Sequence, residues 1–482
     1  MSRPFRTFEL RAFAAVALFA VLATGCAVNP ATGRREFTLV TAGQELAIGQ
    51  EGYTATVAEY GQYDDPALAA YVDSVGHRLA RVSERPELDW HFTVLDDPMV
   101  NAFAMPGGYI YITRGILAYL NSEAEMAAVL GHEVGHVTAR HGVRQQSAAQ
   151  AANIGISIVS IFVPQLNNQV GHDLSNTLGS ALLSGYGRDH ELEADRLGAQ
   201  YLARSGYDPQ AMIRVIGVLK NQEAFDAVVA KQEGREPSHY HGTFASHPDN
   251  DTRLQQVVGE ASNLKVANPS ENKTEFLKQT EGLVFNDSVS EGVVRNNKFM
   301  HPDLGIALTF PPEWHVKNST AQLVALSPQS DATIQLKIDY TPSGTVTEYA
   351  HRAAGNGAAV ETLEIEKLHA AIGSANNAVL GIIYFDRKAF LIQCNAKTAE
   401  AYNAQREAMK TAIRSFHALS EDERMQIKPL AIKLVTAKKG DTYAKLAQHS
   451  PLGKNAESYL RLINEQYPQG EPDVGQSLKI VE

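Results

Sequence analysis

Residues 129–136 read Val-Leu-Gly-His-Glu-Val-Gly-His, an HExxH motif inside an apolar segment with helical periodicity. On an α-helix His132 and His136 leave the same face one turn apart, so both imidazoles can converge on one metal ion. Glu133 lies beside them and can hold and deprotonate a metal-bound water molecule. The motif also arises by chance as two histidines on a helix surface, so the neighbouring sequence has to decide.

Two features around the motif favour a metal site. Ser122 and Glu125 predict a capping box at the start of the helix. Gly131 and Gly135 are poor helix formers, and their presence indicates a neighbour that is too close for a side chain. The motif therefore belongs to a helix that we expect to pack tightly against another element.

A second helix, predicted to open at Arg188 and to end at Gly206, supplies carboxylates. Glu191 and Asp195 share one face of it. A carboxylate is a good third zinc ligand and leaves the fourth position for water. A second carboxylate one turn away could accept the free ring N–H of a ligating histidine. The two helices together predict a catalytic site for one Zn²⁺ per chain.

Between about residues 29 and 264 the chain resembles the HtpX-like and CAAX-prenyl-protease-like zinc metalloproteases, in particular their periplasmic lipoprotein (BepA/LoiP-like) branch. The resemblance rests on HExxH, on the Glu-x-x-x-Asp of the second helix, and on Asn101–Gly108, Ser246-His247-Pro248 and Arg253. It implies a mainly helical zincin-type (HExxH gluzincin) protease domain with a small sheet.

The resemblance also implies residue roles. His132, His136 and Glu191 would bind zinc, Glu133 would be the catalytic base, and Asp195 would support a ligating histidine. The oxyanion could be assisted by His247, Arg253 or His190, and the sequence does not choose among them.

Residues 101–113 read as a hairpin of two strands joined by a Pro-Gly-Gly turn. In proteases of this kind the sheet edge beside the zinc helix binds an extended substrate by β-augmentation. Asn101, Ala102, Phe103 and Ala104 are therefore candidates for the substrate-binding edge strand. The alternative is a hairpin that serves only the core.

The N-terminus has the features of a targeting signal. Arg3, Arg6 and Arg11 precede a short apolar run that ends in Thr24-Gly25-Cys26, which predicts a signal peptide over residues 1–25 and a lipobox. We expect Cys26 to be lipidated. The resemblance to bacterial lipoproteins then implies a periplasmic protein anchored to the outer membrane. The alternatives are an ordinary cleaved signal peptide and an anchor helix.

Composition agrees with an envelope protein. The formal net charge is −11; the first 25 residues carry three Arg and one Glu, which leaves −13 for the remainder. This balance disfavours nucleic-acid binding. The second cysteine, Cys394, has no partner once Cys26 is acylated and reads as a buried strand residue. A chain of 482 residues with 44% hydrophobic content can form two or three cores.

The domain prediction is α+β and multidomain: a protease domain at 26–265, a linker at 266–296, a small α+β domain at 297–420 and a βααβ module at 428–482. The phrase at 304–314 makes the third similar to the PsbP/Mog1 fold, which we interpret as an interaction or spacing module. The last resembles a LysM module, a class that binds N-acetylglucosamine-containing glycans. The alternative is a degenerate module that merely packs on the protease.

Two further segments bear on access to the site. The apolar run at 153–163 is too short to span a bilayer and suits either a lid or a packed helical hairpin, with membrane-surface contact a weaker third interpretation. His247 precedes Pro248 on an extended loop. It could occupy the fourth zinc position as a latch, or it could contact substrate in the open state.

These features predict a zinc-dependent endopeptidase of the bacterial cell envelope that degrades misfolded or misassembled periplasmic and outer-membrane proteins. Its predicted partners are those substrates, the outer membrane through the lipid anchor, and peptidoglycan through the C-terminal module. The alternatives are an assembly factor with a silent zinc site and a peptidoglycan-binding anchor protein. Glu133 favours the enzyme, because a pure binder does not need a general base.

Overall fold

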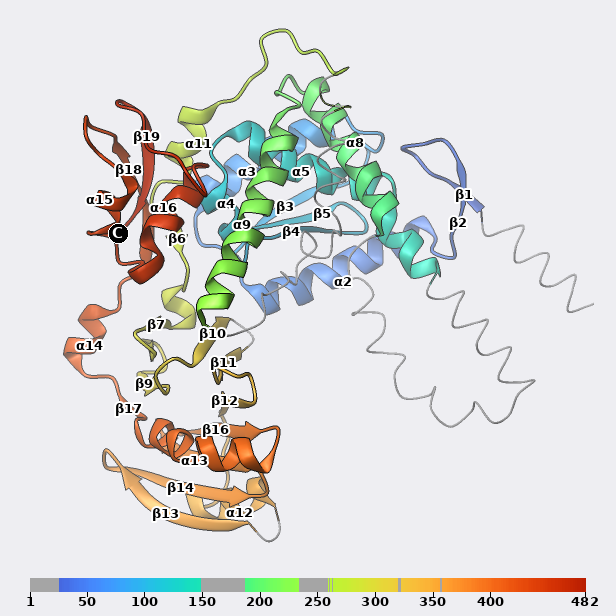
Figure 1. Ribbon diagram of the computed structural model, residues 1–482. Coiled ribbons are helices and arrows are strands. Elements are labelled where there is room, and N and C mark those ends of the chain that lie inside the picture. Colours follow the sequence, from blue (N-terminus) through green and yellow to red (C-terminus); the bar gives the residue numbers. More distant parts are fainter. Residues whose placement is uncertain are drawn as a thin grey trace, which may run out of the picture.

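The computed structural model describes residues 26–148, 187–233, 259, 261, 263–319, 322–355 and 358–482. They form a mixed α/β protein with several helices and sheets, which confirms the coarse fold class (Figure 1). The predicted signal peptide, the apolar run at 153–163, His247 and Arg253 lie outside these residues. Within the described ranges, no helix is long and apolar enough to cross a bilayer.

The N-terminal part combines helices with a three-stranded sheet, and its first two strands form a separate two-stranded sheet. Its elements are β1 (Cys26–Val28), β2 (Arg35–Phe37), α2 (Ala42–Tyr60), α3 (Pro66–Ala80), β3 (His91–Leu95), β4 (Ala102–Met105), β5 (Tyr109–Thr113), α4 (Arg114–Tyr119), α5 (Glu123–Thr138), α8 (Arg188–Arg204) and α9 (Ala211–Glu233). The sheet order is β3-β5-β4, with β3 parallel and β4 antiparallel to β5. Strand β4 is therefore an edge strand that packs against α5.

The predicted hairpin is confirmed. Ala102 pairs with Ile112 and Met105 pairs with Tyr109 across the Pro-Gly-Gly turn. Gly108 has a φ of +103°, and a Cβ there would lie 2.9 Å from the carbonyl oxygen of Asp89, so only glycine fits without strain. The turn thus seats the hairpin directly against the strand that follows Asp89.

The segment at 266–296, predicted as a linker, contains ordered elements in the structure. They are α11 (Lys273–Gln279), β6 (Val284–Phe285), η2 (Val289–Glu291) and β7 (Val293–Arg295). Phe276 and Phe285 are buried in the same hydrophobic core as the helices of the N-terminal part. A turn-rich beginning at residues 268–272 concealed the short apolar segments that follow it.

A second domain hangs below the first in Figure 1 and has its own core. Its elements are β8 (Lys298–His301), β9 (Ile306–Thr309), β10 (His315–Ser319), β11 (Gln322–Leu326), β12 (Ala332–Asp339), α12 (Val346–Ala354), β13 (Ala359–Ile365), β14 (Leu368–Ala375), β15 (Ala378–Phe385), β16 (Lys388–Ala396), α13 (Ala399–Arg414) and β17 (His417–Ala418). An antiparallel sheet of order β10-β11-β12-β16-β15-β14-β13 dominates it. Cys394 is a free, fully buried residue of β16, as predicted, and burial raises the pKa of its thiol.

The C-terminal module follows α14 (Glu421–Gln426) and consists of β18 (Leu430–Thr436), α15 (Tyr443–Ala447), η3 (Gly453–Asn455), α16 (Ala456–Ile463) and β19 (Ser477–Val481). Strand β18 lies between β19 and β6 in one sheet. The second domain is therefore inserted between two strands that pair with each other. Buried module residues, among them Leu460 and Ile463, join the core of the N-terminal part.

Lys479 ties this module to the N-terminal part from inside. Its side chain is 1% exposed, and Nζ donates to the carbonyl oxygens of Ala118 and Leu120 at 2.6 and 2.8 Å. These carbonyls lie at the C-terminal end of α4, where a cation is favoured. Burial lowers the pKa of Lys479 to about 7. The module is thus seated on the N-terminal part by apolar burial and by a buried polar contact.

Candidate metal centre

Helix α5 begins as the sequence predicts, with one difference at its cap. The Ser122 side chain accepts a hydrogen bond from the backbone N–H of Glu125. The Glu125 carboxylate accepts from the backbone N–H of Asn121, not from that of Ser122, so the reciprocal half of the capping box is displaced by one residue. Helix α5 is buried along its whole length and therefore forms the centre of the N-terminal part.

Three glycines let α5 and α8 cross in close contact. A Cβ at Gly135 would lie 3.0 Å from the carbonyl oxygen of Ala194, and one at Gly131 would lie 3.4 Å from that of Gly198. A Cβ at Gly198 would lie 3.0 Å from the backbone nitrogen of His132. The predicted close neighbour of the two α5 glycines is therefore the backbone of α8. Because no Cβ holds the two backbones apart at these positions, side chains beside the contact on α5 can reach side chains on α8.

This crossing brings the predicted metal ligands together. The Nε2 atoms of His132 and His136 are 3.0 Å apart. The two carboxylate oxygens of Glu191 lie 3.5 Å from Nε2 of His132 and 3.6 Å from Nε2 of His136. Among the described residues, these three side chains form the group of potential ligands whose atoms lie within 4.8 Å of one another.

The donor set fits a zinc ion. Tetrahedral zinc with metal–nitrogen distances of about 2.0–2.1 Å holds neighbouring ligand atoms about 3.3 Å apart. The three separations between His132, His136 and Glu191 lie around that value. Two imidazoles and one carboxylate, all at most 1% exposed, are also the ligand types of catalytic zinc sites that keep one position open.

Two further predicted residues lie at this group. Asp195 Oδ1 is 2.8 Å from Nδ1 of His132, so the carboxylate can accept the ring N–H and leave Nε2 unprotonated. Glu133 follows His132 on α5, and its side chain is fully buried. The structure therefore assembles His132, Glu133, His136, Glu191 and Asp195 in one buried region.

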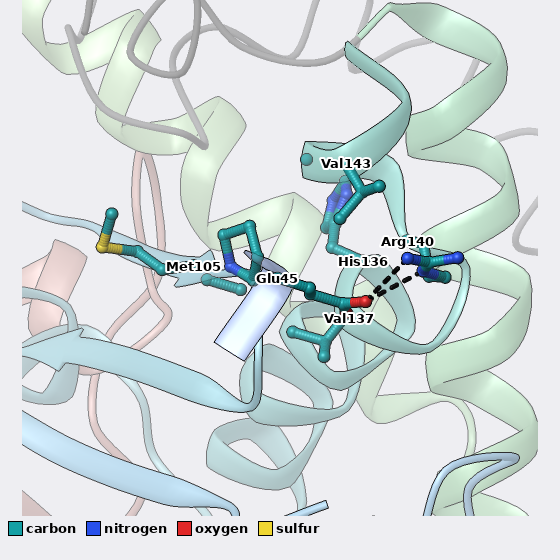
Figure 2. A pocket seen from close by; sticks show the side chains of 9 residues that line it. Glu45, Met105, His136, Val137, Arg140 and Val143 are labelled. Carbon is teal, nitrogen blue, oxygen red and sulfur yellow. Dashed lines mark hydrogen bonds and ion pairs between the residues drawn. The ribbon is translucent and has the colours of Figure 1, made fainter. Parts of the chain in front are cut away.

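The C-terminal end of α5 is shaped by a buried ionic cluster. Arg140 has a φ of +56°, an uncommon conformation for a non-glycine residue. The Glu45 carboxylate of α2, 1% exposed, contacts Arg140 through Nε and Nη2 at 3.0 and 2.9 Å, and it also pairs with Arg85. Figure 2 shows the Glu45 and Arg140 side chains pointing toward each other, with His136 and Val143 near them. The cluster holds the turn at Arg140, after which the chain is helical again over residues 141–148.

That turn places a histidine that sequence reasoning did not identify. Nδ1 of His141 is 2.9 Å from Nδ1 of His136, and Nε2 of His141 is 3.0 Å from Glu193 Oε2. Burial lowers the pKa of His141, and the hydrogen bond from His141 lowers the pKa of Glu193 to about 2. The sequence signal was a third histidine shortly after HExxH and a third carboxylate between Glu191 and Asp195.

The remaining predicted site residues have different positions. Ala102 is buried and Phe103 and Ala104 are half-buried on the edge strand β4, while Asn101 is buried just before it. His190 stacks on His141 with ring centroids 4.4 Å apart, and burial lowers the pKa of His190 to about 4. His247 and Arg253, the other two oxyanion candidates, are not among the described residues.

Comparison with known proteins agrees with this geometry. Residues 66–261 match the model of peptidase family M48, which confirms the predicted resemblance for this part of the chain. The beta-barrel assembly-enhancing proteases of Yersinia pestis and Escherichia coli are 32% and 30% identical over 241 and 243 residues. The mitochondrial metalloendopeptidase OMA1 of Schizosaccharomyces pombe is 32% identical over 185 residues, 38% of this chain and 54% of that protein.

These matches cover part of each chain. They span 48% and 49% of this chain for the two bacterial proteases, and 47% of each of those proteins, so the chain spans about half the length of the relatives it matches. Among solved structures, a cyanobacterial PsbP (CyanoP) from Synechocystis aligns with 27% of this chain and 96% of its own at 14% identity, with a TM-score of 0.22. The predicted PsbP/Mog1 similarity stays a prediction.

The helix crossing can be tested by adding a methyl group at Gly135. We expect Gly135→Ala to push α8 away from α5, because the new Cβ would meet the Ala194 carbonyl at 3.0 Å. Overpacking of this kind costs about 1–3 kcal/mol of unfolding free energy. Zinc affinity should fall with it, because Glu191 moves with α8. Chemical denaturation and a zinc competition titration measure the two effects.

The matched control is Gly217→Ala on α9, where a Cβ would meet nothing within 4 Å. It should raise stability by about 0.5–1 kcal/mol, the usual gain from replacing a helix-interior glycine, and leave zinc affinity unchanged. Equal stability and equal zinc affinity of Gly135→Ala and wild type would show that the crossing is not as close as described.

Proposed function

We propose that this chain is a zinc-dependent endopeptidase of the bacterial cell envelope. The observation that carries the proposal is the buried group of His132, His136 and Glu191 on two crossing helices, with Asp195 on the far nitrogen of His132. The family match over residues 66–261 and the metalloendopeptidase relatives support it. In this proposal the N-terminal part is a zincin-type protease domain.

Each residue of the proposed site has a separate role in the reaction. His132, His136 and Glu191 would hold the ion, which when bound would lower the pKa of a water molecule and polarise the scissile carbonyl. Glu133 takes the proton from the attacking water and passes it to the leaving amine. Asp195 keeps the hydrogen of His132 on Nδ1, so that Nε2 stays a lone-pair donor.

Strand β4 is the proposed docking edge for substrate. In the described part of the sheet it pairs with β5 alone, and it packs against α5, which carries Glu133. An extended peptide can add to such an edge through main-chain hydrogen bonds, which requires an unfolded or locally opened substrate. This requirement and the relatives named for beta-barrel assembly support misfolded or misassembled envelope proteins as substrates.

The first prediction concerns the metal and the general base. Wild type should bind about one zinc per chain, Glu133→Gln should keep it, and His136→Ala should lose most of it. Casein cleavage by Glu133→Gln should fall about 10²-fold or more, because the general base is gone. Elemental analysis and a fluorescent casein assay measure both.

The control is Glu59→Gln, the same change at an exposed position on α2. It should keep both zinc and activity. Unimpaired cleavage by Glu133→Gln would refute the proposed mechanism.

We also propose that Cys26 is lipidated and that the protein is tethered to the periplasmic face of the outer membrane. The lipobox motivates this location. Cell fractionation should find wild type with membranes and Cys26→Ser in the soluble fraction, because a lipid chain supplies the membrane affinity. A wild-type protein that is already soluble would favour the ordinary signal peptide.

The C-terminal module is proposed to contact peptidoglycan through an exposed surface around Val474. There the turn at 438–442 lies beside the loop at 471–476, since the Tyr443 N–H donates to Glu471 and the Gly475 N–H donates to Ala437. Val474 on this loop is 70% exposed. Deleting the module would uncover the core it shares with the N-terminal part, so a surface substitution is the cleaner probe.

Purified peptidoglycan should therefore retain wild type in a pull-down and retain Val474→Asp less well. Tyr340→Ser, an exposed aromatic residue (65%) of the second domain, is the control and should behave as wild type. Equal retention of Val474→Asp and wild type would instead favour a module that only packs on the protease.

A further inference from the structure

The two histidines of the proposed zinc site are supported in different ways. Nδ1 of His132 faces the carboxylate of Asp195 directly, at 2.8 Å. Nδ1 of His136 faces another imidazole, that of His141, at 2.9 Å. The other nitrogen of His141 reaches Glu193, which like Asp195 lies on α8. We propose that His141 and Glu193 are positioning residues that fix the tautomer of His136 for metal binding; this inference rests on the proposed zinc site.

The proton positions follow from the donor and acceptor types. An ionised carboxylate only accepts hydrogen bonds, so Glu193 requires a hydrogen on Nε2 of His141. Nδ1 of the neutral His141 ring is then an acceptor and requires a hydrogen on Nδ1 of His136. Nε2 of His136 is left with its lone pair, and this atom faces Nε2 of His132 and the Glu191 carboxylate.

The surroundings hold His141 in this orientation. Its side chain is 0% exposed and stacks on the His190 ring at an interplanar angle of 14°. Glu193 is also held by Arg144, whose Nη1 donates to the same oxygen at 3.1 Å. The chain turns back toward α5 at Arg140, which has a positive φ and is held by the carboxylate of Glu45. This turn places His141 beside His136. The order is therefore built into the packing at the end of α5.

Helix α8 serves both histidines through alternate residues. Glu191 is the proposed ligand, Asp195 supports His132, and Glu193 supports His136 through one intervening ring. Removing the partner of a ligating histidine typically lowers metal affinity about 10- to 100-fold. We therefore expect His141 and Glu193 to act on zinc affinity rather than on the peptide directly.

Two variants of the full chain test this relay, by which we mean the hydrogen bonds that run from His136 through His141 to Glu193. His141→Phe keeps an aromatic ring of similar size but cannot accept a hydrogen bond from His136. Glu193→Gln keeps the side-chain shape, but its amide can either accept from or donate to His141, so the order of hydrogens is no longer fixed. Each should weaken zinc binding about tenfold or more in a chelator competition titration.

The matched control is Thr138→Val, which removes a different buried polar contact between the same two helices. Thr138 Oγ1 is 2.8 Å from the hydroxyl of Tyr201 on α8 and has no part in the relay. This variant should lose stability by about 1 kcal/mol and keep wild-type zinc affinity. If zinc affinity merely follows stability, Thr138→Val will lower it as much as the two test variants, and the positioning role is refuted.

A second readout separates the relay from the zinc proposal. Long-range ¹H–¹⁵N spectra of the metal-free, histidine-labelled protein should show His136 with its hydrogen on Nδ1 in wild type. The hydrogen should be mixed between the two nitrogens in both variants. These two spectroscopic results support the relay whether or not wild type binds zinc. A wild-type protein that binds no zinc would refute only the proposed function. The relay is overturned if wild type carries the hydrogen of His136 on Nε2. It is also overturned if both variants bind zinc within twofold of the wild-type affinity. If His141→Phe does not fold, Glu193→Gln alone decides.

Discussion

The close crossing of α5 and α8 is the constraint on which the candidate site depends. Gly131 and Gly135 bring the α5 backbone against α8, and Gly198 returns the contact from the other side. Each glycine costs about 1 kcal/mol of helix propensity relative to alanine, so the arrangement is retained at the expense of local stability. The gain is geometric, because at this separation the potential ligand atoms of His132, His136 and Glu191 lie within 4.8 Å of one another.

Charged residues near the end of α5 have specific partners. Glu45 pairs with Arg85 and Arg140 at the end of α5, and Glu193 pairs with Arg144 and His141. Burying an ionised group without a partner would be costly, so these pairs fix both the helix end and the hydrogen positions behind the ligands. The buried Lys479 of the C-terminal module is compensated in a different way, because it donates to the backbone carbonyls of Ala118 and Leu120 in the N-terminal part.

The sequence predicted those parts whose signals are local. The HExxH helix, the helix opening at Arg188 and the hairpin at β4 and β5 follow from periodicity, spacing and turn residues, and the structure has them at those places. The α5 glycines also predicted a close neighbour, which proved to be α8. The cluster was predictable because His132 and His136 lie one turn apart on α5, and Glu191 and Asp195 lie one turn apart on α8.

What the sequence did not predict depends on contacts between distant segments. The pairing of β6 with β18 turns a supposed linker into part of the core, and no local pattern marks a two-residue strand. The role of His141 depends on the left-handed turn at Arg140, which Glu45 holds from 95 residues away. Lys479 reads as a surface residue until α4 and α16 are placed beside it.

The central claim is that the crossing of α5 and α8 builds one zinc site from two imidazoles and one carboxylate. X-ray absorption at the zinc edge, recorded on the full chain loaded with one equivalent of zinc, tests it most directly. We expect two imidazole nitrogens and carboxylate oxygen at about 2.0–2.2 Å from the zinc, and the loss of one imidazole in His136→Ala. A spectrum with one imidazole or none in wild type, or one that His136→Ala leaves unchanged, would contradict the account.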